Sequence, residues 1–454
     1  MYQISDITKR EKKRKVRRSL FFSFWDGFFA SIQFGIIDQF ATPIALFMGA
    51  NNIAIGWLNF IRNTLVSTIQ ASSADATLAL RSRKRLITAC VFIAAMLWIP
   101  TFFVPFMFKT HRVAVFIVLF SITSSFNMFA TPAWASLMSE YIPHTKRGRY
   151  FGWRATTLGI VYSVSVIAGG IFLNYCNSFN LFLGFAVLMI AAAASRFISW
   201  FFLTLMYEPA WRVRTTDYFS FFSFISKLPT SNFARFAFYS AIFMVGVALA
   251  APFFPVYMLT ELKLSYFEYT ILMGATVFTS LVTQQYWGNF TDRYGNLRIF
   301  KVAVFLISLV PFFWVLSRNF TYLVLLQLWA GFLWAGLTLS STNFIYDVAI
   351  STKRERCIAY FNFLTGAGLG VGALAGGFLY GLLPPTFNSR FISLFLASGF
   401  IRFCGAFCIM FLTKEVKKVE ETRFHTLLFD LSGIRAIGLF GKELLVRQRK
   451  REDK

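Results

Sequence analysis

The sequence predicts an all-α integral membrane protein with twelve transmembrane helices. Of its 454 residues, 57% are hydrophobic and only 14% are charged, a composition too apolar for a soluble protein of this length. Apolar stretches of about 20 residues, the length that a helix needs to cross roughly 30 Å of hydrocarbon, recur along the whole chain. We place the spans at 20–46, 53–75, 86–108, 113–138, 150–174, 180–206, 233–259, 266–288, 299–317, 321–346, 357–382 and 390–412.

Basic residues are sorted by loop, and this sorting predicts the orientation. The net charge is +25, and Lys and Arg gather in the N-terminal arm, in the loops after even-numbered spans and in the C-terminal tail. By the positive-inside rule both termini face the cytoplasm, and we expect a plasma membrane, in a bacterium the inner membrane. The charge favours contact of the basic termini with anionic lipids rather than nucleic-acid binding. The opposite loops carry only Lys109, Arg112, Lys263, Arg318 and Arg390.

The first span carries two carboxylates, Asp26 and Asp38, in an otherwise apolar helix. Intramembrane carboxylates are costly unless paired, hydrated or protonated, so both are candidate ion-coupling residues. Asp26 is close to the inner end, where it could simply contact water or a basic loop. At 1.5 Å per residue, Asp38 and Arg62 of the second span lie at similar depths, roughly 12 and 14 Å below the outer ends of their spans. An ion pair between them is therefore predicted, although it could serve only to relieve the desolvation cost of both charges.

The charged loop 288–301, GNFTDRYGNLRIFK, repeats an earlier loop of the chain. Asp292 and Arg293 are followed by Gly295, which permits the tight turn that so short a connection needs. Asp292, Arg298 and Lys301 have counterparts 217 residues earlier, but this first copy lacks both glycines and the arginine after the aspartate. The counterparts are Asp75, Arg81 and Lys84.

A second repeat joins the ends of the fourth and tenth spans. Glu140 and the sequence TKRGR at 145–149 match Asp347 and TKRER at 352–356, at an offset of 207 residues. Two six-span halves in the same orientation follow, related by an axis along the membrane normal. The predicted organisation is a basic cytoplasmic N-terminal arm at 1–19, an N-terminal six-helix half at 20–206, a cytoplasmic linker at 207–232, a C-terminal six-helix half at 233–413 and a basic amphipathic tail at 414–454.

The loop 288–301 resembles the G-x-x-x-D-R-x-G signature of the major facilitator superfamily, and the parallel repeat resembles that superfamily's two halves. The resemblance implies the superfamily's fold, with twelve helices in two six-helix halves related by pseudo-twofold symmetry, which rock about a midplane site. It also implies a cytoplasmic gate at the inner helix ends. The gate residues would be Asp75, Arg81, Glu140, Arg149, Gly288, Asp292, Arg293, Gly295, Arg298, Asp347 and Arg356.

The resemblance also implies where a substrate would bind, because certain helices of the superfamily line the cavity. Arg196 and Arg402 occupy matching positions of the sixth and twelfth spans, which usually lie outside the cavity, so we expect structural roles for them. The fifth span lacks the Gly-Pro step of the superfamily's proton-driven drug antiporters, which lowers the case for antiport. The substrate-cavity candidates are Gln33, Asn59, Arg62, Asn127, Tyr162, Tyr257, Trp334 and Asn362.

No enzyme constellation is found. The three histidines, His111, His144 and His425, fall in loops or the tail, and there is neither a phosphate-binding loop nor a nucleophile elbow. No metal or cofactor is expected beyond a coupling ion, H⁺ or Na⁺. The sequence predicts a monomeric secondary active transporter, a symporter that moves a small solute by alternating access. Two alternatives stay open: a uniporter or exporter of an amphiphilic or lipid-like compound, and a non-transporting sensor or scaffold, which the degenerate first loop favours.

Overall fold

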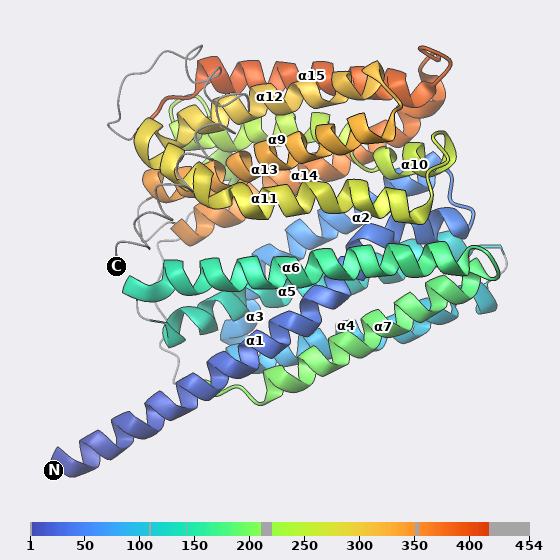
Figure 1. Cartoon of the computed structure of the whole chain (residues 1–454). Helices are drawn as coiled ribbons and strands as arrows, with labels where there is room; N and C mark the ends of the chain where they lie inside the picture. The colour runs from blue at the N-terminus through green and yellow to red at the C-terminus, as the bar shows by residue number, and fades with distance from the viewer. Residues whose placement is uncertain (1, 109, 143, 210–219, 350–353, 417–454) are drawn as a thin grey trace, which may run out of the picture. The chain divides into compact units, whose positions relative to one another are not determined.

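The chain folds into long helices, shown by a computed structural model that describes residues 2–108, 110–142, 144–209, 220–349 and 354–416 (Figure 1). Its regular elements in these ranges are helices. They form two compact units. The first comprises Met1–Thr216, Ala248–Gly274 and Asn362–Leu383, and the second comprises Asp217–Val247, Ala275–Phe361 and Pro384–Lys454.

The first unit is built mainly from the first seven helices. Helix α1 packs against α6 and α7, while α4 packs against α5 and α7. Their shared core contains Leu86, Val91, Leu137, Met138 and Leu203, all almost fully buried. The helices are α1 (Tyr2–Phe47), α2 (Asn52–Ala71), α3 (Ser73–Leu80), α4 (Arg83–Met107), α5 (Arg112–Tyr141), α6 (His144–Cys176), α7 (Leu181–Thr204) and α10 (Phe253–Thr260).

In the second unit, α12 packs against both α13 and α15. Phe236 is fully buried at the centre of an aromatic cluster, where its ring contacts Phe300, Phe344 and Phe361. The helices are α8 (Phe221–Ser226), α9 (Asn232–Ala250), α12 (Asn296–Leu316), α13 (Phe320–Val348), α15 (Arg390–Leu412) and the corresponding parts of α11 (Tyr266–Tyr294) and α14 (Arg354–Leu382).

Each of the twelve predicted spans falls on helix. Among the described residues, ten helical segments are long and apolar enough to cross a membrane. The other two predicted spans fall on α2 and α11, helices of 20 and 29 residues with several polar side chains. The seventh span is interrupted between α9 and α10, where Pro252 precedes the first residue of α10 and has no backbone N–H to continue the helix.

Short polar residues start many of the helices. Each accepts a hydrogen bond on its side-chain oxygen from the backbone N–H three residues later, which satisfies a donor that the helix leaves free. These residues are Asn51, Ser82, Asn180, Ser220, Asn319 and Ser389.

The connections at the basic helix ends differ between the units. A single residue, Gly295, separates α11 from α12, and its φ of 91° lies in the left-handed region that glycine tolerates best. The predicted tight turn at Gly295 is therefore confirmed. In the first unit the short helix α3 lies between α2 and α4, and Arg81 takes the left-handed conformation with φ of 49°.

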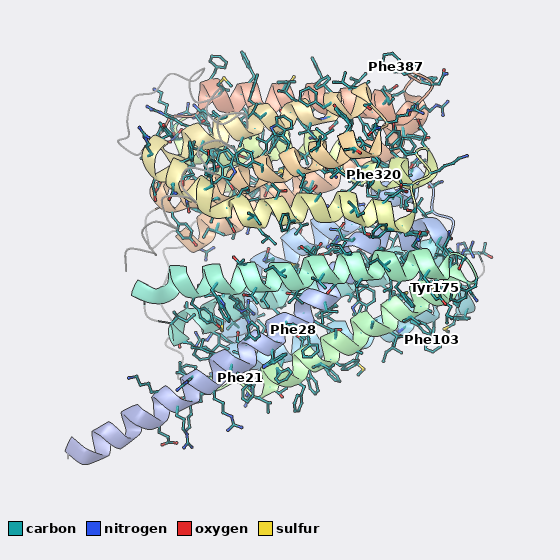
Figure 2. All side chains as sticks on the ribbon, in the orientation of Figure 1. Phe21, Phe28, Phe103, Tyr175, Phe320 and Phe387 are labelled. Atoms are coloured by element: carbon teal, nitrogen blue, oxygen red, sulfur yellow. The ribbon has the colours of Figure 1, made fainter. Side chains whose placement is uncertain are left out.

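Large aromatic side chains face away from the packed helices of each unit. Figure 2 shows Phe21, Phe103, Tyr175 and Phe387 pointing outward, and all four are exposed. So much exposed aromatic surface would be a liability in water, but it suits a hydrocarbon environment. The predicted N-terminal arm continues α1 as one helix from Tyr2 (Figure 1), whereas the predicted amphipathic tail helix lies in 417–454, outside the described residues.

Candidate functional site

Asp38 and Arg62 form an ion pair between α1 and α2. The Asp38 Oδ1 atom accepts a hydrogen bond from Arg62 Nη2 at 2.5 Å. The pairing that the depths predicted is therefore confirmed. The side chains are 32% and 27% exposed, respectively, so the pair is sheltered but not sealed. On its other side the Arg62 guanidinium lies over the Phe120 ring of α5, 5.3 Å from its centroid, a cation–π contact that helps to fix the cation.

The residue after Asp38 links three helices by hydrogen bonds. Gln39 donates from Nε2 to the Tyr162 hydroxyl of α6 at 2.8 Å, and its backbone carbonyl accepts from the Tyr269 hydroxyl of α11 at 2.7 Å. Tyr269 is almost fully buried. Because these bonds hold α1 immediately beside Asp38, they fix the position of the carboxylate.

Gln33 and Asn127 are buried polar residues on α1 and α5, with exposures of 1% and 5%. The side-chain carbonyl oxygen of each has no hydrogen-bond partner among the described protein atoms. A buried acceptor without a donor is costly. These two predicted cavity residues are therefore acceptors available to water or to a donor group of a ligand.

Asp26 lies in a different environment from Asp38. It is 5% exposed and accepts a hydrogen bond of 2.7 Å from the Ser199 hydroxyl of α7, which in turn accepts one of 3.1 Å from Arg196 Nη1. Nearby, Arg154 of α6 donates from Nη2 to the backbone carbonyl of Ser23 on α1 at 3.0 Å. Asp26 is thus part of a closed network that joins α1 to α7.

Among the described residues, the hydrogen bonds of Asp38, Arg62 and Gln39 involve none of the remaining cavity candidates. Asn59 donates from Nδ2 to the backbone carbonyl of Ile55 within its own helix at 3.0 Å. Tyr257 is almost fully buried, Trp334 is half-buried and Asn362 is exposed. Trp334 belongs to the second unit.

A charged cluster closes the basic helix ends of the first unit. Arg83, at the first position of α4, is 1% exposed and donates from Nη1 and Nη2 to the two carboxylate oxygens of Glu140 at 2.7 and 3.0 Å. Glu208 accepts bonds from the Ser82 hydroxyl and from the backbone N–H groups of Arg83 and Lys84. A carboxylate at this position stabilises the N-terminus of a helix.

The second unit repeats this cluster with weaker charge. Asn296, at the first position of α12, donates from Nδ2 to Asp347 at 2.5 Å. Glu415 accepts from the backbone N–H groups of Leu297 and Arg298 at 2.7 and 3.2 Å. Asn296 therefore takes the place of Arg83, and Glu415 takes that of Glu208.

Sequence reasoning missed Arg83, Glu208, Asn296 and Glu415. A signal for two of them was present, because Glu208 and Glu415 are 207 residues apart, the offset that also relates Glu140 to Asp347. The charge pattern matched Arg81 with Arg298, whereas the contacts match Arg83 with Asn296.

The other predicted gate residues lie at or near helix ends. Asp75 is exposed in the first turn of α3, Arg81 is exposed at the C-terminus of that helix, and Asp292 and Arg293 are exposed in the last turn of α11. A Cβ built on Gly288 would have open space around it, so packing does not require glycine there. Arg298 and Arg356 are half-buried, and the side chain of Arg149 lies outside the described ones.

Arg402 is held without a carboxylate partner among the described residues. It is 3% exposed in α15 and donates to the backbone carbonyls of Gly246, Val247 and Ile307 at 3.3 to 3.5 Å. These bonds tie α15 to α9 and α12, which agrees with the expected structural role.

Comparisons with known proteins point to one family of membrane transporters. A family model described as Major Facilitator Superfamily matches residues 233–440. Multidrug resistance protein 2 of Bacillus subtilis (strain 168) is 23% identical over 179 residues, which are 39% of this chain and 42% of that protein. This chain thus spans about two fifths of the length of the curated relative it matches.

Solved structures of similar fold cover nearly the whole chain. A mutant of the nucleoside transporter NupG matches with a TM-score of 0.67 at 13% identity, covering 87% of this chain and 100% of that one. A bacterial homolog of the human lysosomal transporter Spinster matches at 0.59 and 15%, covering 88% and 95%. The human organic anion transporter MFSD10 matches at 0.58 and 12%, covering 87% and 99%.

The molecule is an integral multi-pass membrane protein whose fold is that of solved transporters. Residues 233–440 match the model of the Major Facilitator Superfamily, the family that the 288–301 loop resembles, and transporter structures share the fold over most of the chain. The predicted fold class is therefore confirmed, and the match to a family of transporters agrees with the expectation that the protein is not an enzyme. The boundaries of the two predicted halves remain a prediction.

Proposed function

We propose that this protein is a cation-coupled secondary active transporter in which the Asp38–Arg62 pair carries the coupling. The observation that supports this role is a carboxylate bonded to an arginine at 2.5 Å while 32% of its side chain is exposed. Water and a cation from solution can reach such a carboxylate. A proton or a sodium ion would then compete with Arg62 for Asp38 during the cycle.

Asp26 is the weaker candidate for coupling. A coupling residue must exchange its ion with solution, but Asp26 is 5% exposed and is bonded to Ser199 inside the helix bundle. A role in joining α1 to α7 accounts for its contacts. Asp26 becomes the candidate only if Asp38 is shown to be dispensable.

The buried acceptors of Gln33 and Asn127 support a substrate that carries hydrogen-bond donors. The structural neighbour NupG is a nucleoside transporter, and nucleosides have such donors, so they are the first compounds to test. Another neighbour, MFSD10, is an organic anion transporter, which makes organic anions the second class to test.

A gate at the basic helix ends completes the proposal, together with cytoplasmic termini and a plasma-membrane location. The clusters of Arg83 with Glu140 and of Asn296 with Asp347 would hold the helix ends of each unit as rigid parts. The exposed Asp292 would then make or break contacts as the transporter changes state. The cations of the α1 arm would contact anionic lipids of the same leaflet.

Export of an amphiphilic compound is the second candidate. The similarity to Multidrug resistance protein 2 of Bacillus subtilis supports it, and in this proposal Asp38 would couple export to the ion gradient as well. Direction of transport therefore distinguishes the two candidates, while the role of Asp38 is common to both.

The experiment is uptake into proteoliposomes with and without an imposed proton or sodium gradient. A thermal-shift screen of nucleosides, organic anions and cationic dyes first selects the compound, since a ligand that binds the native state raises its stability. Asp38→Asn should abolish accumulation but retain exchange of labelled for unlabelled compound. Glu11→Gln, which alters an exposed carboxylate of the same helix, is the control. Accumulation by Asp38→Asn at the wild-type level would exclude Asp38 as the coupling residue.

A further inference from the structure

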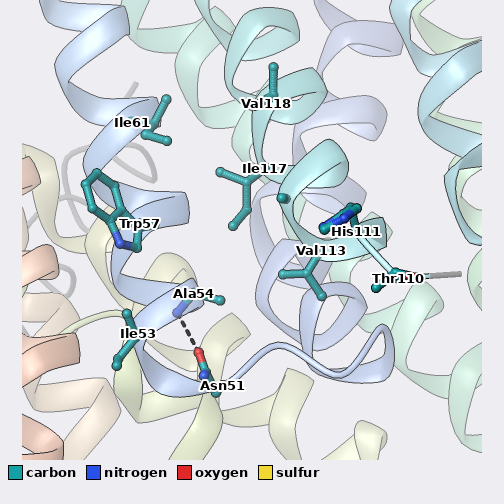
Figure 3. A pocket seen from close by; sticks show the side chains of 11 residues that line it. Asn51, Ile53, Ala54, Trp57, Ile61, Thr110, His111, Val113, Ile117 and Val118 are labelled. Carbon is teal, nitrogen blue, oxygen red and sulfur yellow. Dashed lines mark hydrogen bonds between the residues drawn. The ribbon is translucent and has the colours of Figure 1, made fainter. Parts of the chain in front are cut away.

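A groove opens on the side of the first unit between α2 and α5, at the ends opposite the basic loops. It has a volume of about 430 Å³, within the range of ligand sites. Apolar side chains of both helices line it, among them Ile53, Trp57 and Ile61 of α2 and Ile117 and Val118 of α5, and Figure 3 shows Ile117 pointing toward α2. Ile53, Trp57 and Val118 are each about two-fifths to one-half exposed, so the groove opens at the surface.

The groove has the length of an acyl chain segment within one leaflet. Ile53, Trp57 and Ile61 lie four residues apart along α2, so they line about 12 Å of its axis at 1.5 Å per residue. One leaflet of the hydrocarbon core is about 15 Å thick. The groove therefore runs along most of the leaflet in which the α2–α5 ends lie, parallel to the helices.

Among the residues that line the groove, the polar side chains lie at one end, which is formed by the first residues of α2 and α5 and the residues just before them. Asn51 uses its side-chain oxygen to accept the N–H of Ala54 at 2.8 Å, which leaves its Nδ2 group as a donor. The indole nitrogen of Trp57 points toward this end (Figure 3). His111, exposed at the start of α5, also lines the groove.

Arg112 adds positive charge to the same end. Its Nη2 atom lies 3.4 Å from a Cβ built on Gly49, which places the guanidinium beside the loop that leads to Asn51. No ion pair of Arg112 is found among the described residues, and its side chain is exposed. It is also one of few cations in the loops on this side. This end of the groove thus has hydrogen-bond donors in its lining and a cation beside it, which fit an anionic phosphodiester.

We propose that this groove binds an anionic glycerophospholipid, with one acyl chain between α2 and α5 and the phosphate at Arg112, Asn51 and His111. The apolar lining alone would suit any hydrophobic occupant. The donors and the cation at one end select a molecule with a phosphate joined to a chain. This site is distinct from the Asp38–Arg62 pair and from the lipid contacts proposed for the basic termini, which lie at the other membrane face.

The test measures the melting temperature of the purified full chain in non-ionic detergent with added dioleoyl-phosphatidylglycerol, dioleoyl-phosphatidylcholine or inorganic phosphate. The measurements are made at about 0.15 M salt, and variants of the groove separate binding there from binding at the exposed basic termini. Phosphatidylglycerol should raise the melting temperature of the wild type by several degrees, and phosphatidylcholine and phosphate should raise it by less than half as much. Native mass spectrometry should show retained phosphatidylglycerol.

Two variants address the two parts of the site. Ala114→Trp fills the groove from an exposed position of α5 that lines it, and Arg112→Gln removes the cation. Each should at least halve the shift given by phosphatidylglycerol. Val164→Trp, which adds the same bulk to an exposed apolar position of α6, is the matched control and should retain the full shift. If Ala114→Trp fails to fold, Ala114→Leu replaces it.

Three results would overturn the proposal. An unchanged phosphatidylglycerol shift in the groove-filling variant would place the lipid elsewhere. An equal shift with phosphatidylcholine would remove the selection for an anion, and an equal shift with phosphate would show that the acyl chain contributes nothing. None of these results bears on whether Asp38 couples transport.

Discussion

Arg83 and Glu140 are joined by two parallel hydrogen bonds of 2.7 and 3.0 Å, and only 1% of the arginine side chain is exposed. Their counterparts in the second unit, Asn296 and Asp347, are joined by a single bond in which the donor is neutral. The same position of the repeat therefore holds a buried charge in one unit and none in the other. This difference can be measured.

Glu140→Gln should lower the free energy of unfolding by about 2 kcal/mol, because it removes the ionised group that accepts two hydrogen bonds from a buried guanidinium, whose contact with Glu208 is longer, at 3.9 Å. Asp347→Asn, the matched change, should cost less than about 1 kcal/mol, since its partner is a neutral amide. Thermal or chemical denaturation in detergent measures both. Equal losses of unfolding free energy in the two variants would show that the ionised Glu140 does not stabilise the buried Arg83 charge.

Arg62→Ala should destabilise the protein more than the double change Asp38→Ala with Arg62→Ala. The single variant leaves Asp38 sheltered without its cation, whereas the double variant removes both charges. Because the pair is partly exposed, we expect a coupling of about 1–2 kcal/mol in a double-mutant cycle. The exposed Glu11–Lys15 pair of α1 serves as the control and should show no measurable coupling. Additive effects at Asp38 and Arg62 would contradict the ion pair as a stabilising contact.

Arg81→Gly should stabilise the protein by about 1 kcal/mol, because Arg81 holds a φ of 49° that costs an L-residue with a side chain more than glycine. Gly295→Ala should destabilise by a similar or larger amount, since φ at that residue is 91°. Melting temperatures of the two variants should therefore move in opposite directions. A fall in both would mean that the Arg81 side chain contributes more than its backbone costs.

Cysteine labelling tests the orientation. In a background without the native cysteines, of which Cys404 is exposed, Arg390→Cys should react in intact cells with a membrane-impermeant thiol reagent. Arg85→Cys should react only after the cells are opened. Both positions are exposed, whereas Arg83, in the same first turn of α4, is buried and unsuitable. The reverse pattern would place the termini outside.

Asp292→Asn should shift the population toward the state that opens to the cytoplasm, if the proposed gate depends on its charge. A cysteine at Asn362, an exposed cavity candidate of α14, should then react faster from the cytoplasmic side. Glu11→Gln provides the control for loss of an exposed carboxylate. Unchanged reactivity at Asn362→Cys would make the loop at Asp292 a structural turn only.

The spans and the ion pair could be predicted because each depends on a local quantity. Hydropathy over about 20 residues locates a span, and counting residues from the span ends placed Asp38 opposite Arg62. The two polar helices α2 and α11 were found for the same reason, although their composition is less apolar than that of the other spans.

The clusters at the basic helix ends were harder to predict because the number of residues that separates matching positions of the repeat changes within one loop. Asp75 and Asp292 are 217 residues apart, but the contacts relate Arg83 to Asn296, which are 213 apart. The difference arises from α3, which lengthens the first loop. Alignment by charge alone kept the offset of 217 residues beyond this insertion, and it therefore matched Arg81 with Arg298.

Because a single residue, Gly295, connects α11 to α12, we expect the two helices to move together. With no slack between the helices, a tilt of α11 at its basic end must turn the start of α12, where Glu415 and Asp347 are attached. In the first unit α3 separates α2 from α4 and gives that joint compliance. We therefore expect the joint at Gly295 to be the stiffer of the two, so that a displacement of a helix end is transmitted there and absorbed at α3.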